Sequence, residues 1–139
     1  MKHACLTLVA AALVLMAGSI PGVACRCEGP ANVKVAFAEA DLVVFGDVEE
    51  IEGDLQTSKG QSVLFRAQQS WKHPAEIQLR LSNKTTCAAD LEVGKTYLLF
   101  LKKHPDTPGF FANKCFGNLS GEAAIDAVKT FRPGTPVGN

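Results

Sequence analysis

Cysteines are the residues of this sequence that are most able to bind a metal or form covalent bonds. Cys25 and Cys27 are separated by one residue, Cys87 and Cys115 follow far along the chain, and Cys5 lies near its start. Thiols bind zinc, act in redox exchange or form disulfides. Structural zinc sites commonly use C-x₂-C pairs, and thioredoxin-like centres use the same spacing, which does not occur here. The spacing therefore favours disulfides.

Residues 1–24 have the pattern of a secretory signal peptide. Lys2 supplies a positive start, and the apolar run Ala4–Ala17 is followed by small residues up to Ala24. That run is shorter than the ~20 residues that a membrane-spanning helix needs. We predict cleavage after Ala24, which also removes Cys5. The four remaining cysteines predict two disulfides in a secreted or periplasmic protein.

An alternative use of the same segment is a lipid anchor. A cysteine that directly follows a signal segment can be lipidated in bacteria, and Cys25 has that position. Such signals usually have a larger aliphatic residue where this chain has Gly22. Lipidation would consume both the thiol and the amine of Cys25, and it is the one way in which we expect the protein to reach a membrane.

Disulfides would fix the predicted mature N-terminus. Because the side chains of a C-x-C pair point to opposite sides of an extended chain, each of these cysteines is expected to bond Cys87 or Cys115, which leaves two pairings open. Either pairing closes long loops worth about 4 kcal/mol each. The free α-amine, with an ordinary pKa of about 7.7–8.0, and the carbonyl oxygen of Cys25 can together chelate a metal. A rigid terminus of this kind could enter the open zinc site of another protein and displace its water.

Composition and charge exclude other classes of function. The chain has 139 residues, of which 47% are hydrophobic and 20% charged, and this suits one globular domain. Basic and acidic residues number 14 each, and this balance argues against nucleic-acid binding. No G-x-S-x-G motif occurs, and His73 and His104 are expected in loops. We therefore expect neither an enzyme nor a cofactor of the protein's own.

Two helices are predicted at the ends of the mature chain. Asn32 is a good N-cap for a two-turn helix with Val33, Ala36, Phe37 and Ala40 on one face. Near the other end, Ser120 is predicted to cap a helix that stops at Pro133. Its inward face is expected to comprise Ala124, Ile125, Val128 and Phe131. Residues 133–139 are predicted to form a loose tail.

Five short strands are predicted between these helices. Leu42–Ile51 is rich in β-formers, with a bulge or bend expected at Gly46. The other strands are expected around 63–71, at 77–81, at Tyr97–Leu101 and at Phe110–Cys115, with a polar connector at Ser82–Cys87. Because the strands follow one another without helical crossovers, they predict a small closed barrel rather than a parallel α/β sheet.

Two further patterns have alternative interpretations. An acidic cluster could bind Ca²⁺, but a solvated sheet edge is favoured; it comprises Asp41, Asp47, Glu49, Glu50, Glu52 and Asp54. Asn83-Lys84-Thr85 and Asn118-Leu119-Ser120 match the N-glycosylation sequon, which matters only in a eukaryotic secretory pathway.

The order of these features resembles a known family. The predicted mature terminus, Cys25-Arg26-Cys27-Glu28-Gly29-Pro30, has the form C-x-C-x-x-P. A helix, the segment Asp41–Val48, the pair Trp71-Lys72 and two later cysteines follow in turn. This arrangement is similar to the inhibitory domain of the tissue inhibitors of metalloproteinases, above all to short single-domain bacterial members, over nearly all of Cys25–Phe131.

The resemblance implies a fold, a partner and a site. The fold would be mainly β, a five-stranded OB-fold (netrin-like) barrel with flanking helices over residues 25–132 and the disulfides Cys25–Cys87 and Cys27–Cys115. The function would be inhibition of a zinc endopeptidase by a monomeric protein. In that case the Cys25 amine and carbonyl would bind the protease's zinc, and no other metal would be needed. Arg26 would enter the pocket beside the zinc. The residues expected along the cleft are Cys27, Glu28, Thr85, Thr86 and Cys87.

Two positions differ from the family pattern. The family usually has a small Thr or Ser where this chain has Arg26, and an apolar residue where it has Glu28. Netrin-like modules also occur as binding domains without inhibitory activity. The alternative function is therefore a non-inhibitory, extracytoplasmic protein-binding module, with a lipid on Cys25 as one way to hold it at a membrane.

Overall fold

The computed structural model describes residues 25–84 and 86–137. The predicted signal peptide, Thr85 and the last two residues lie outside these ranges. Within them, no helix has the length and apolar character needed to cross a membrane.

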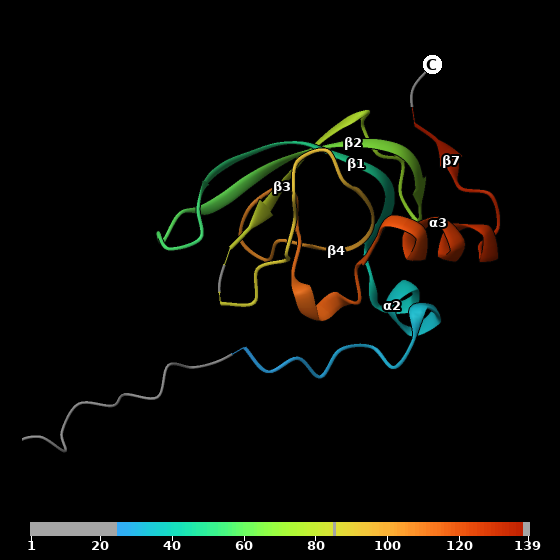
Figure 1. Ribbon diagram of the computed structural model, residues 1–139, viewed down its shortest axis with the longest axis horizontal. Coiled ribbons are helices and arrows are strands. Elements are labelled where there is room, and N and C mark those ends of the chain that lie inside the picture. Colours follow the sequence, from blue (N-terminus) through green and yellow to red (C-terminus); the bar gives the residue numbers. More distant parts are fainter. Residues whose placement is uncertain (1–24, 85, 138–139) are drawn as a thin grey trace, which may run out of the picture.

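Five strands close into a barrel (Figure 1), as the sequence predicts. Strands β1 (Leu42–Asp54), β2 (Gly60–Trp71) and β3 (Gln78–Asn83) form an antiparallel meander. The short β5 (Phe110–Phe111) lies parallel to β3 and antiparallel to β4 (Thr96–Lys103). Strand β4 then pairs with β1 and completes the barrel. A two-residue strand, β6 (Leu119–Ser120), extends the pairing of β4.

Strands β1 and β4 are buried on both faces. Alternate residues of each strand point into the barrel, while Val43, Leu98 and Phe100 point to the opposite side and are equally buried. A strand covered on both faces needs apolar side chains at successive positions rather than at alternate ones. This double burial explains the unbroken apolar runs at the start of β1 and along β4.

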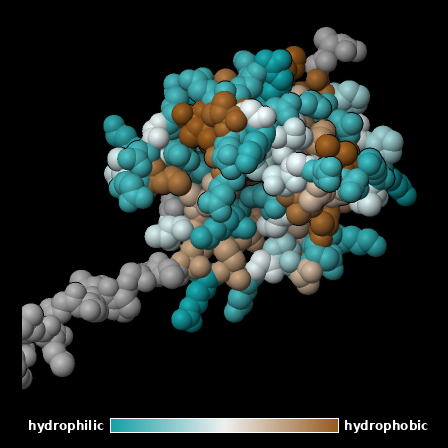
Figure 2. Space-filling model, in the orientation of Figure 1, coloured by the Kyte–Doolittle hydropathy of each residue, from teal (hydrophilic) through white to brown (hydrophobic). Residues whose placement is uncertain are grey.

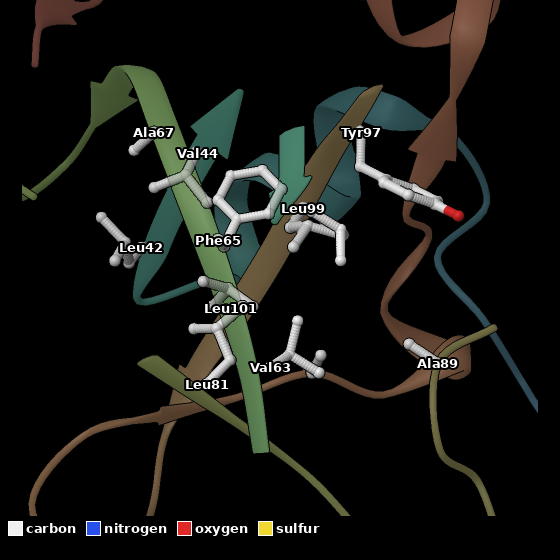
Figure 3. Packing of buried hydrophobic residues seen from close by; sticks show 12 residues of the cluster. Leu42, Val44, Val63, Phe65, Ala67, Leu81, Ala89, Tyr97, Leu99 and Leu101 are labelled. Carbon is white, nitrogen blue, oxygen red and sulfur yellow. The ribbon is translucent and has the colours of Figure 1, made fainter. Parts of the chain in front are cut away.

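The barrel interior is filled by large apolar side chains (Figure 3). Phe65 of β2 lies among Val44, Leu99 and Leu101 in this view, and each of these four side chains is at most 1% exposed. Because β2 faces solvent on its other side, only alternate residues of this strand enter the interior. Val63, Phe65 and Ala67 point into the interior, whereas Trp71, at the end of the strand, packs in the second cluster outside the barrel.

Two short helices cover the outer faces of β1 and β4 (Figure 1). Helix α2 (Val33–Glu39) begins as predicted, because the Oδ1 of Asn32 accepts hydrogen bonds from the backbone N–H groups of Lys34 and Val35. Helix α3 (Gly121–Thr130) follows β6 and ends before Pro133. The second core cluster lies between these helices and the barrel wall.

The predicted pair Trp71-Lys72 joins both helices to the barrel. The indole Nε1 of Trp71 donates a hydrogen bond to the carbonyl oxygen of Arg132, 2.8 Å away, just after α3. The ammonium of Lys72 donates to the carbonyl oxygens of Ala38 and Ala40 at the end of α2. The roles of these two residues are therefore structural.

The pairing of β1 is irregular at Gly46, as expected, but the extra residue there is Gln68 of β2. The pairing of β1 with β2 shifts between Phe45 and Gly46. A side-chain carbon at Gly46 would overlap the carbonyl oxygen of Arg66, because the backbones approach closely there.

Several expectations about burial and element ends are wrong. Ile125, expected on the inward face of the second helix, is 42% exposed, and the strand expected at 77–81 begins at Gln78, so that Ile77 lies before it and is 50% exposed. Ala127 takes the inward position in α3 instead. The predicted strand Phe110–Cys115 ends at Phe111 and is followed by the 3₁₀ turn η2 (Lys114–Phe116). The described part of the predicted tail is not loose, because Thr135–Pro136 forms β7 and pairs with β2.

Candidate functional site

The N-terminal segment runs in extended form along the lower rim of the molecule, beneath the orange η2 turn, and then enters α2 (Figure 1). Two disulfides attach this segment to the barrel. Cys25 is bonded to Cys87, with a Cα–Cα distance of 5.4 Å, and Cys27 is bonded to Cys115, with a Cα–Cα distance of 4.9 Å. These are the pairs implied by the family resemblance. The extended C-x-C segment thus contacts two separate loops.

The loop that carries Cys87 is positioned by a buried asparagine at the end of β3. Asn83 is completely buried, and its Nδ2 donates to the carbonyl oxygen of Ala89 at 3.0 Å and to Oε1 of Gln61 at 3.1 Å. The N–H of Ala89 donates back to Oδ1 of Asn83 at 2.8 Å. This reciprocal pair closes the connector between residues 83 and 89, with Cys87 inside it.

The loop that carries Cys115 is the η2 turn. Its N-cap is Asn113, whose Oδ1 accepts a hydrogen bond from the N–H of Cys115 at 2.9 Å. The N–H of Lys114 donates to the carbonyl oxygen of Cys87 at 3.0 Å. The two disulfide-bearing loops are therefore hydrogen-bonded to each other, independently of the N-terminal segment.

Most of the predicted site residues lie together on one exposed surface. We call this surface the ridge and define it by Cys25–Glu28, Thr86 and Cys87. Arg26, Cys27, Glu28 and Thr86 are exposed, while the two ends of the Cys25–Cys87 bond are half-buried. Thr85 lies outside the described residues. Hydrophilic side chains project from this lower rim in the space-filling view (Figure 2).

The two disulfides of the ridge lie against each other. The Sγ of Cys25 is 3.6 Å from the Sγ of Cys115 and 3.9 Å from the Sγ of Cys27, although neither pair is bonded. In the described part of the chain, Cys25, Cys27 and Cys115 are the only group of three or more His, Cys, Asp or Glu side chains close enough to hold one ion.

The acidic residues of β1 contact polar side chains of neighbouring strands. These contacts join Glu49 to Arg66 and Gln78, Asp47 to Gln68 and Thr96, and Glu52 to Arg80. Because the partners are exposed or half-buried, the pattern fits a solvated sheet face.

Both sequon asparagines use their side-chain amides inside the fold. Asn83 is held by Ala89, as described above. The Nδ2 of Asn118 donates to the carbonyl oxygen of Asn113 at 3.0 Å, and its Oδ1 accepts from the N–H of Phe100 at 2.9 Å. A glycan on either nitrogen would replace one of these hydrogen bonds.

The two histidines in the described residues occupy loops, as expected. His73 is exposed directly after β2. His104 follows β4, its Nδ1 accepts a hydrogen bond from the N–H of Asp106 at 3.3 Å, and its ring meets Phe111 edge-on.

Sequence reasoning missed Asn83 and Asn113, which position the loops that carry Cys87 and Cys115. Asn83 has the type and context of a glycosylation site or a turn residue, and nothing local indicates that it is buried. Asn113 is a good N-cap by type, but the predicted strand through Cys115 concealed it. The one signal that could have indicated this turn is the preference of asparagine for the N-cap position, two residues before Cys115.

No protein-family model matches this chain, and no curated protein matches it. The similarity to the tissue inhibitors of metalloproteinases therefore stays a prediction, and the geometry of the ridge carries the functional argument.

Proposed function

We propose that this chain is a secreted inhibitor of a zinc metalloprotease, and that its inhibitory surface is the ridge. The observation that carries this proposal is the attachment of Cys25 to Cys87. This disulfide occupies the sulfur of Cys25 and leaves the backbone atoms of that residue for another ligand. After cleavage at Ala24, these atoms include a free amine and the carbonyl oxygen.

Attachment at two points supports this role. The Cys25–Cys87 and Cys27–Cys115 bonds hold the terminus on a rigid barrel through loops that are hydrogen-bonded to each other. A terminus that is already fixed loses little conformational freedom when it enters a cleft, so more of the interaction energy appears as affinity. The amine and carbonyl would displace the water from the protease's zinc and thereby remove the attacking group.

Charge on the ridge restricts the class of protease. Arg26 and Glu28 are both exposed on either side of Cys27. Burying the guanidinium of Arg26 in an apolar pocket would be costly unless a carboxylate paired with it. We therefore expect the target to have an acidic group in the pocket beside its zinc.

The structure bears on the choice between a free and a lipidated Cys25. A thioether to a lipid would use the same sulfur that bonds Cys87. The disulfide therefore favours a free terminus over a lipid anchor. A binding module without inhibitory activity is the remaining alternative, and the experiment below separates it from inhibition.

The test compares the chain that begins at Cys25 with the same chain carrying one additional alanine before Cys25. Adding the alanine moves the free amine away from the carbonyl of Cys25, so the chelate is lost while both disulfides can form. We expect inhibition of a zinc endopeptidase with an acidic pocket to weaken at least about 100-fold, which corresponds to about 2.7 kcal/mol. The measurement is the inhibition constant in a peptide-cleavage assay.

A matched control carries the additional alanine after Asn139, far from the ridge in sequence, and should inhibit like the parent. Equal inhibition by both terminal extensions would contradict chelation by the Cys25 terminus. Binding to the protease without any loss of its activity would favour the non-inhibitory module.

A further inference from the structure

Sulfur atoms from three segments of the chain gather at one point on the ridge. The Sγ atoms of Cys25, Cys27 and Cys115 all lie within 4.8 Å of one another, and Cys87 is bonded to Cys25. The cluster is accessible, because Cys27 is exposed and the other three cysteines are half-buried. In the oxidised protein these sulfurs are two disulfides and cannot act as thiolate ligands.

The non-bonded distances from the Cys25 sulfur to the sulfurs of Cys27 and Cys115 are close to those in a zinc site. Zinc bound by four thiolates is tetrahedral with Zn–S distances of about 2.3 Å, so neighbouring sulfurs are about 3.8 Å apart. The non-bonded distances from Cys25 to Cys115 and to Cys27 are 3.6 Å and 3.9 Å. When the disulfides open, the sulfurs of each bonded pair separate from about 2 Å to about 3.8 Å. We propose that the reduced chain binds one Zn²⁺ through Cys25, Cys27, Cys87 and Cys115.

Two of the ligand-bearing loops do not depend on the disulfides for their position. The connector around Cys87 is held by the hydrogen bonds between Asn83 and Ala89. The η2 turn is capped by Asn113, and the N–H of Lys114 bonds the carbonyl oxygen of Cys87. Reduction breaks none of these contacts, so the thiols of Cys87 and Cys115 stay near each other.

The N-terminal segment is also held by packing close to its cysteines. Pro30 lies so close to Gly117 that a side-chain carbon at Gly117 would come within 2.7 Å of the proline ring. Gly29 also lies beside Cys115, because a side-chain carbon at Gly29 would be in ordinary van der Waals contact, at 3.5 Å, with the carbonyl oxygen of Cys115. Because Cys27 is only three residues before Pro30, its thiol remains within reach of the cluster after reduction.

The chemical steps balance with a phosphine as reductant. Each disulfide takes up one phosphine and one water and gives two thiols and one phosphine oxide. Zinc then replaces up to four thiol protons, which are released to solvent. This site is distinct from the proposed function. There the zinc belongs to the protease and meets backbone atoms of Cys25, whereas here the ion is bound through the side chains of the protein itself.

The test titrates the chain from Cys25 to Asn139, which contains every helix and strand that the structure describes, with Co²⁺ under anaerobic conditions after reduction by a water-soluble phosphine. Cobalt reports its geometry, because tetrahedral thiolate coordination gives intense visible bands and sulfur-to-metal charge transfer. We expect these bands to saturate at one ion per chain and to disappear when Zn²⁺ is added. The oxidised protein should give none of them.

A displaced-thiol variant tests whether the site is preorganised. Cys87→Ala combined with Lys84→Cys keeps four thiols, but the side chain at position 84 lies against Gly60, on the side of the β1–β2 turn. We expect this variant to bind Co²⁺ at least tenfold more weakly. Equal binding by parent and variant would overturn the proposal, because any chain with four thiols would then suffice.

Folding is followed in the same samples through the near-UV circular dichroism of Trp71, the one tryptophan of the chain. If reduction weakens this signal, Zn²⁺ should restore it in the parent and not in the displaced-thiol variant. Octahedral spectra, or metal binding that leaves a weakened Trp71 signal unchanged, would also refute the proposed site. None of these outcomes depends on protease inhibition, so this proposal and the proposed function can fail separately.

Discussion

The barrel and the ridge are held together by different forces. In the barrel, β1 pairs with a neighbour on each edge and the interior side chains are almost completely buried. On the ridge, Arg26, Cys27 and Glu28 are exposed, and two disulfides join this segment to the rest of the protein. The barrel therefore depends on burial, and the exposed N-terminal residues of the ridge depend mainly on covalent bonds.

The difference shows how a small protein can keep a mostly exposed surface rigid. The two disulfides close loops of 62 and 88 residues, and each is worth about 4 kcal/mol in the chain-entropy model. Exposed residues cannot gain that much from packing. Rigidity at the ridge thus comes from bonds that leave the surface free for a partner. We expect changes in the barrel to affect the whole molecule and changes on the ridge to stay local.

The largest effect is expected from Phe65→Ala in the barrel interior. Phe65 is completely buried among side chains of β1 and β4, so its truncation leaves a cavity at the centre of the core. We expect the free energy of unfolding to fall by about 3–5 kcal/mol. Chemical denaturation followed by the fluorescence of Trp71 measures this loss.

The matched control for the barrel is Ile77→Ala. This side chain is also large and apolar, but it is 50% exposed, so its removal should cost about 0.5 kcal/mol or less. Similar losses for the two variants would mean that the barrel interior does not dominate stability, and the contrast between barrel and ridge would no longer hold.

A smaller and more local effect is expected when one disulfide is removed. Cys25→Ser combined with Cys87→Ser should lower the free energy of unfolding by up to about 4 kcal/mol, because the unfolded chain gains freedom. The near-UV signal of Trp71 should stay native at 25 °C. Hydrogen exchange should accelerate at residues of the ridge and not in β1. Loss of the Trp71 signal would show that the barrel needs the ridge.

The other disulfide supplies the control for this measurement. Cys27→Ser combined with Cys115→Ser opens a loop of 88 rather than 62 residues. On chain entropy alone, the two double variants should differ by only about 0.3 kcal/mol. A much larger difference would indicate that one bond also supports native packing.

The sequence predicts the barrel well because burial leaves a repeating signal. Alternation marks β2 and β3, the apolar run marks β4, and Asn32 marks the start of α2. The local spacing of the cysteines left two pairings open, and the choice required the resemblance to a family. The pairing depends on where two loops meet in space, and the hydrogen bond between Lys114 and Cys87 joins residues 27 positions apart.

Sequence reasoning fails where contacts between distant segments determine which residues are buried or paired. Ile125 has the spacing of an inward residue, but α3 presents Ala124 and Ala127 to β4 at close range instead. Thr135–Pro136 is held because β2 offers a free edge. These choices depend on tertiary contacts that no local pattern records.

The smallest of the three effects is expected at Asn83, where the barrel meets the ridge. Asn83→Ala leaves the N–H and the carbonyl oxygen of Ala89 without their hydrogen-bond partners. Because Ala89 is buried, each of these unsatisfied groups costs about 1–3 kcal/mol. We expect a loss of about 2 kcal/mol in the free energy of unfolding, since relaxation of the connector admits water. Hydrogen exchange should accelerate at Ala89 and Cys87, while β1 keeps its protection.

The control is Gln78→Ala, which removes an exposed amide bonded to Glu49 and should change stability by less than about 0.5 kcal/mol. If Asn83→Ala accelerated exchange across β1 and β4 as strongly as at the connector, the barrel and the ridge would unfold as one unit. In that case the ridge would not be a separable surface, and the effect of a ridge variant on inhibition could not be distinguished from a loss of fold.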